Sequence, residues 1–127
     1  MTAHNIETIL AGLAEMNFAH IADFNDGHAG AFWSGPPADG GGTSPWEMHP
    51  DTDEFLMCID GSVEIQVLAQ QPGTEPLVDD LTCTVLQAGE FVVVPKGHWH
   101  RHHATVAFRE FYITPGPSEH SMDSDPR

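Results

Sequence analysis

Short runs of apolar and β-branched residues, separated by turn-forming residues, fill most of this chain. Runs of this length predict short β-strands. The strands expected on this basis cover residues 29–34, 55–59, 63–68, 81–86, 90–94, 98–104 and 106–114. Residues 35–45 and 70–75 contain proline and glycine and predict loops. This pattern indicates an all-β fold, an antiparallel sandwich or barrel.

The two ends of the chain have different patterns. Apolar side chains in residues 5–16 recur at the spacing of one helical face, namely Ile6, Ile9, Leu10, Leu13 and Met16. Asn5 is a suitable N-cap, so we expect a short amphipathic helix that packs on the outside of a sheet. Residues 115–127 are polar and contain proline, which predicts a flexible tail.

A length of 127 residues is typical of one domain with a core of its own. The expected organisation is a single domain over residues 1–127, with an N-terminal helix region at 1–20, a core at about 29–114 and the tail at 115–127.

Asp60-Gly61 separates two of the predicted strands and is a strong signal for a two-residue hairpin turn. Because paired residues of a hairpin share a face, one face then carries a largely apolar row. The row consists of Glu54, Leu56, Cys58, Val63, Ile65 and Val67. Glu54 does not fit this row, since a buried carboxylate is costly unless it is paired or bound to a cation. That cost favours a ligand role for Glu54.

Further ligand-type side chains flank this hairpin. Strand parity places Glu47 and His49 on one face, and it places His98, His100 and His102 on one face of a later strand. Imidazole nitrogens and carboxylate oxygens bind borderline divalent metals. These residues converge on one metal site if both strands face the same interior.

The charge balance is strongly acidic: 19 acidic residues oppose 4 basic ones, for a net charge of −15. Such a charge disfavours nucleic acid and anionic membrane surfaces as partners and attracts cations. The chain shows neither a membrane-spanning apolar run nor a basic-then-apolar signal peptide, so we expect a cytoplasmic protein. Cys58 and Cys83 lie in apolar runs and are expected to be buried free thiols.

Two motifs in this chain resemble those of the cupin superfamily. The first motif has the pattern HXH, then E after three or four residues, then G after six more. Residues 47–61 fit it with Glu47 in place of the first histidine. The second motif has a glycine, a PXG triplet, a histidine and a final asparagine. Residues 89–104 match it from Gly89 to His100, with Ala104 in place of the asparagine.

The resemblance implies a jelly-roll barrel, the double-stranded β-helix of cupins, with one divalent metal ion in its mouth. It implies that His49, Glu54 and His100 are metal ligands. Glu47 either ligates through an oxygen or turns away and leaves a three-ligand site. Three ligands of these types form the facial triad of non-haem iron oxygenases. The extra carboxylate favours iron or manganese, with nickel or zinc as alternatives.

Two functions remain open from the sequence. The first is a metal-dependent enzyme, a dioxygenase in preference to an isomerase or lyase, that acts on a small organic molecule. The second is a non-catalytic cupin that binds a small ligand. His102 either shuttles protons in the site or forms an internal hydrogen bond. The other histidines outside these motifs, among them His28 and His120, are assigned no role. By resemblance we expect a homodimer.

Overall fold

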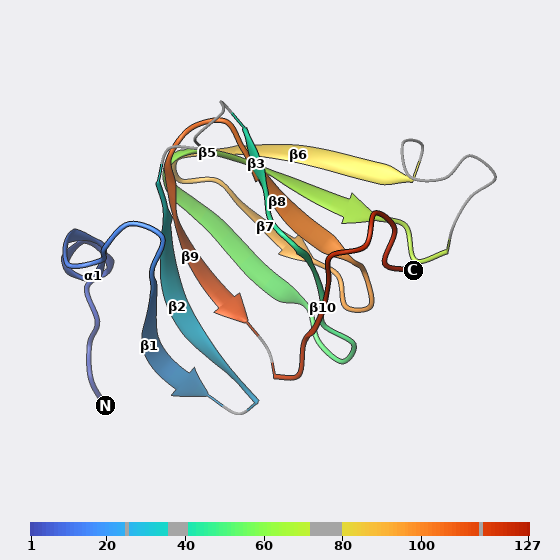
Figure 1. Ribbon diagram of the computed structural model, residues 1–127. Coiled ribbons are helices and arrows are strands. Elements are labelled where there is room, and N and C mark those ends of the chain that lie inside the picture. Colours follow the sequence, from blue (N-terminus) through green and yellow to red (C-terminus); the bar gives the residue numbers. More distant parts are fainter. Residues whose placement is uncertain (25, 36–40, 72–79, 115) are drawn as a thin grey trace.

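The computed structural model describes residues 1–24, 26–35, 41–71, 80–114 and 116–127. These residues form a curled all-β structure with one short helix, which confirms the predicted jelly-roll class (Figure 1). The elements are α1 (Ile6–Ala11), β1 (Phe18–Phe24), β2 (Gly27–Ser34), β3 (Gly42–Thr43), β4 (Trp46–Met48), β5 (Glu54–Leu68), β6 (Leu81–Gln87), β7 (Phe91–Val94), β8 (His100–Ala104), β9 (Phe108–Thr114) and β10 (Glu119–Ser121). Among the described residues, no helix is long and apolar enough to cross a membrane.

Strand β5 belongs to both layers of the structure. Its first half pairs with β7 and β9, and β9 continues the layer through β2 to β1. Its second half pairs with β6 and β8, and β8 continues the other layer through β4 to β10. All these pairs are antiparallel. In Figure 1 the two layers curve around a common interior.

The hairpin predicted around Asp60-Gly61 is wrong, because β5 runs through these residues as one strand of 15 residues. The register against β9 shifts by one residue between Cys58 and Asp60, which is a β-bulge. The bulge reverses the alternation of side chains, so Cys58 and Val63 both face the interior. Glu54 and most of its apolar row are therefore buried as expected, although for a different reason.

The interior between the layers is the main hydrophobic core. It contains eight buried residues: Leu56, Cys58, Val63, Ile65, Leu86, Val94, Ala104 and Phe108. They come from five strands of both layers, so the core stabilises the curl of β5 against its neighbours.

The N-terminal segment differs from its prediction in two ways. Helix α1 ends at Ala11, well before residue 16, with Gly12 as its C-cap and Asn5 as its N-cap. Leu10 and Leu13 pack on Ala31 on the outer side of β2, which confirms that the helix lies outside the sheet. Strand β1 begins at Phe18, inside the predicted helix region, and the weak apolar alternation of an edge strand explains why it was missed.

The described residues 116–127, for which a flexible tail is predicted, contain a strand that the sequence did not predict. Strand β10 pairs with β4, and the chain beyond it is anchored through Arg127. The Arg127 guanidinium donates hydrogen bonds to the carbonyl oxygens of Ala69 and Gln71 and lies 2.9 Å from the Asp80 carboxylate. Long-range pairing thus orders a polar segment that has no strong local propensity.

An apolar patch lies on the outer face of β5, β7 and β9. Phe55 contacts Phe91 and Phe111, with ring centroids 4.9 and 6.3 Å away. Phe91 and Val93 remain 58% and 54% exposed. Helix α1 packs against β2 instead and includes none of these residues in its cluster. The expected homodimer stays a prediction, for which this patch is the natural interface.

Gly61 and Gly89 offer a matched test of the bulge in β5. Both have positive φ angles, 75° and 87°, so a substitution by alanine strains both by about 1–2 kcal/mol. A Cβ at Gly61 would lie 2.1 Å from the Ala107 carbonyl oxygen, whereas one at Gly89 would meet nothing within 4 Å. We expect G61A to lower the free energy of unfolding by about 1–3 kcal/mol more than G89A does. Urea denaturation measures both; equal losses would contradict the close packing at the bulge.

The two thiols differ in environment, which corrects the expectation that both are buried: Cys58 is buried and Cys83 is exposed. Burial and the nearby Glu110 raise the pKa of the Cys58 thiol to about 11, and its Sγ donates to the Asp60 carbonyl oxygen. We expect a thiol reagent at neutral pH to modify Cys83 in the native protein and Cys58 only after unfolding. In C83S the rapid modification of the native protein should disappear. If the native C83S protein still reacts rapidly, the burial of Cys58 is contradicted.

Candidate metal centre

The four predicted ligands come from three strands and one loop. Glu47 lies in β4, His49 follows β4, and Glu54 and His100 are the first residues of β5 and β8. The loops that carry the two motifs are tied together. The Gly97 N–H donates to the His49 carbonyl oxygen (2.8 Å), and the Lys96 N–H donates to Asp53 Oδ1 (2.9 Å). Asp53 therefore anchors the second motif to the first.

The side chains of Glu47, His49, Glu54 and His100 converge, and one ligand atom of each lies within 4.8 Å of the others. Glu54 Oε2 is 3.0 Å from His49 Nε2 and 2.8 Å from His100 Nε2. Glu47 Oε1 is 3.2 Å from His49 Nε2. Glu54 and both histidines are buried, whereas Glu47 is partly exposed. The cluster could hold a metal ion.

The position of His100 Nε2 is suitable for a metal ligand atom. Its Nε2 is buried and close to Glu54, yet it has no hydrogen-bond partner among the described residues. A buried polar atom without a partner is costly. Ligand atoms that converge on a cation approach one another in this way, because each directs a lone pair at the same point. We therefore find that these residues fit a divalent ion.

The cluster also concentrates opposite charges. Burial by itself lowers the pKa of His49, but its hydrogen bonds with Glu47 and Glu54 outweigh this and raise the pKa to about 10. Burial by itself raises the pKa of Glu54, but its interactions with His100 and His49 lower the pKa to about 2. The carboxylates thus stabilise positive charge at the centre of the cluster, which is the property a cation site requires.

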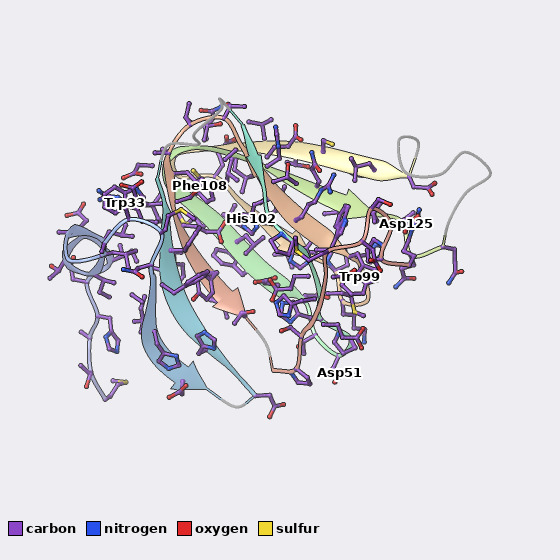
Figure 2. The ribbon with its side chains drawn as sticks, viewed as in Figure 1. Trp33, Asp51, Trp99, His102, Phe108 and Asp125 are labelled. Atoms are coloured by element: carbon purple, nitrogen blue, oxygen red, sulfur yellow. The ribbon has the colours of Figure 1, made fainter. Side chains whose placement is uncertain are left out.

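His102 lies apart from this cluster. Its Nε2 is 2.8 Å from Glu110 Oε2, and its ring stacks on Phe108 with centroids 6.0 Å apart. Figure 2 shows His102 and Phe108 in the interior between the layers, whereas Trp33 lies on the outer side near α1. Burial opposes its charged form, but the Glu110 carboxylate raises the pKa of His102 to about 9. The internal hydrogen bond allowed by the sequence is therefore present.

The remaining histidines of the second motif point elsewhere. His98 Nδ1 lies 2.9 Å from the Leu68 carbonyl oxygen, to which it can donate, and takes no part in the cluster. His103 Nδ1 is 2.9 Å from the Thr43 hydroxyl.

A cavity of about 1010 Å³ opens from the cluster between the layers. Its polar lining includes four carboxylates, those of Asp26, Glu47, Glu54 and Glu110, and three histidines, His28, His102 and His120. Hydroxyl groups such as those of Tyr112 and Thr114 also line it. Three phenylalanine rings also line it: Phe18 stacks on Phe32 with ring centroids 4.3 Å apart, and Phe32 meets Phe108 edge-on at 6.1 Å. No lysine or arginine is among the described residues that line it. A volume of this size accommodates a small organic molecule.

Sequence reasoning missed three polar residues at the site. Glu110 is a buried carboxylate in the inward row of β9, so the argument that singled out Glu54 applies to it as well. The Thr114 hydroxyl lies 3.3 Å from His49 Nε2. His120 Nε2 lies 3.6 Å from Glu47 Oε1, and the pairing of β10 with β4 brings it there. No local signal could have identified His120.

Comparison with known proteins identifies the family. A family model of the cupin domain matches residues 38–113, more than half of the chain. The chain belongs to the cupin family. No curated protein sequence is significantly similar to this cupin.

Solved structures share the fold of this cupin. A cupin-2 domain containing protein from Shewanella frigidimarina is 23% identical, with a TM-score of 0.59 over 87% of this chain and 90% of that chain. Hydroquinone 1,2-dioxygenase PnpCD, solved with Cd2+ and 4-hydroxybenzonitrile, is 18% identical, with a TM-score of 0.65 over 89% and 72%. Hydroquinone 1,2-dioxygenase from Sphingomonas sp. TTNP3, solved with 4-hydroxybenzoate, is 18% identical, with a TM-score of 0.63 over 88% and 74%. At these identities the likeness is one of fold.

Proposed function

We propose that this cupin binds one divalent metal ion, iron(II) or manganese(II), through Glu47, His49, Glu54 and His100. The convergence of these four side chains, two of which (Glu47 and Glu54) line a large cavity, is the observation that carries the proposal. Two imidazoles and two carboxylates suit these ions, and the carboxylates offset the charge of a divalent cation. Nickel and zinc are the alternatives that a titration must compare.

We further propose that the protein is an enzyme that oxidises a small organic molecule in a dioxygenase-type reaction. When bound, the ion would supply the Lewis-acid and redox chemistry of the reaction. The chain itself binds and orients the substrate between the layers. His102, held by Glu110 at its Nε2, lines the same cavity and is proposed to exchange a proton with the substrate there.

The cavity lining favours an uncharged substrate with an aromatic ring. The rings of Phe18, Phe32 and Tyr112 offer stacking and edge-on contacts to such a ring. A substrate carboxylate would meet the four carboxylates of Asp26, Glu47, Glu54 and Glu110, and no lysine or arginine among the described lining residues. His102 is already paired with Glu110. The likeness in fold to the hydroquinone 1,2-dioxygenases supports an aromatic substrate.

A second candidate is a non-catalytic cupin that binds a small ligand. The observation that favours it is Glu47, which faces the cluster where the family motif has a histidine. A second carboxylate lowers the positive charge of a bound ion and so weakens its action as a Lewis acid.

The first prediction here concerns metal binding. We expect protein purified without chelator to bind about one equivalent of Fe(II) or Mn(II) per chain, measured by elemental analysis and equilibrium titration. H49A and H100A each remove a ligand and should weaken binding by more than the ~10–100-fold that is usual for loss of an outer-shell partner.

H103A provides the matched control, since His103 lies on the same strand as His100 but contacts Thr43. Its affinity should equal that of the unmodified protein. The metal proposal fails if the unmodified protein binds none of Fe, Mn, Ni and Zn.

The second prediction separates the enzyme from the binder. Oxygen consumption is measured for the iron- or manganese-loaded protein with hydroquinones, catechols and diketones. We expect uptake with at least one aromatic substrate and a loss of about 10²–10⁴-fold in H102A, the range for a proton-transfer group. Flat traces together with ligand-induced thermal stabilisation would show a binding protein instead.

A further inference from the structure

Strand β10 adds a structural feature outside the region matched by the family model. The match ends at residue 113, and β10 covers Glu119–Ser121. It pairs with β4 in the register Glu119↔Met48, His120↔Glu47 and Ser121↔Trp46. In Figure 1 the red C-terminal segment, which contains β10, runs beside the teal strand that follows β3 along the chain.

This register places His120 next to the least buried residue of the metal cluster. Directly paired residues of an antiparallel pair project to the same face, so His120 and Glu47 share one. The same Glu47 oxygen, Oε1, lies 3.2 Å from His49 Nε2 and 3.6 Å from His120 Nε2. Glu47 is 28% exposed and His120 61%, so His120 approaches the carboxylate from the solvent side. Glu47 thus lies between a buried and an exposed imidazole.

The Glu47 side chain requires a neighbouring contact to fix its conformation more than a histidine at the same position would. A glutamate has more rotatable bonds than a histidine, and fixing it in one conformation costs more entropy. Its strand β4 has only three residues, and its pairing with β8 is confined to Glu47↔His100. The neighbour on its other side is β10, which therefore limits where the Glu47 side chain can go.

We propose that His120 is a positioning residue for the metal centre, which holds the Glu47 carboxylate toward the cluster and so completes a four-ligand set. The inference rests on the proposed metal site. His120 is assigned to Glu47 and not to the ion because its nitrogen is outside the group of four converging ligand atoms. Outer-shell partners of this kind orient the ligands that they contact.

The experiment is a double-mutant cycle on the full chain with Co(II) as the probe. Affinity is measured by titration and the coordination of Co(II) by its visible absorption spectrum, alongside thermal unfolding of each variant. We expect H120A to weaken binding about 10-fold, and its spectrum to shift toward that of E47Q. In E47Q/H120A the affinity should equal that of E47Q alone, because His120 acts through Glu47. H120Q retains an N–H donor and should recover most of the affinity.

H20A is the matched control, since His20 also forms an exposed histidine–carboxylate pair, 2.9 Å from Asp23 and 56% exposed. It should bind Co(II) like the unmodified protein. Two results would overturn the role of His120 while leaving the metal site intact. One is a Co(II) affinity and spectrum in H120A equal to those of the unmodified protein. The other is a loss of affinity in E47Q/H120A equal to the product of the two single losses. Failure of the unmodified protein to bind Co(II) would overturn both the metal site and this inference.

Discussion

The burial of the Glu54 carboxylate between two imidazoles is the constraint on which the rest of this structure depends. A carboxylate out of water is costly without partners, and His49 Nε2 and His100 Nε2 lie 3.0 and 2.8 Å from Glu54 Oε2. They come from a loop and a strand that are far from each other in the sequence. Two hydrogen bonds hold these segments together. The Gly97 N–H donates to the His49 carbonyl oxygen, and the Lys96 N–H donates to the Asp53 carboxylate.

Strand β5 makes this arrangement possible, because it joins the two layers. Its first residue, Glu54, belongs to the cluster of two histidines and two glutamates, while its second half pairs with the strand that carries His100. The bulge before Gly61 keeps buried side chains on the inner face of both halves. The same strand therefore contributes to the core and to the cavity wall.

Part of the site followed from local pattern alone. Glu54 was recognisable because a carboxylate interrupts an apolar row, and that argument needs only strand parity. The same argument would have found Glu110, which lies on the same face of β9 as Phe108 and Tyr112. The hairpin predicted at Asp60-Gly61 was wrong for a physical reason. A glycine with positive φ occurs both in tight turns and in bulged strands, and the local sequence does not distinguish the two.

The amino-acid sequence by itself determined the all-β class and the alternation that buries Glu54, Leu56 and Cys58, since both depend on spacing within short segments. The candidate ligand set followed from the resemblance of two motifs to those of cupins, because spacing alone left His98 and His102 as further candidates. The tertiary structure decided which histidines join the cluster and which do not. It turned His98 toward Leu68, paired His102 with Glu110 and brought His120 to Glu47 through a strand that the sequence had not predicted. These contacts depend on the register between strands far apart in the chain, and register follows from the packing of the whole sheet rather than from any local pattern.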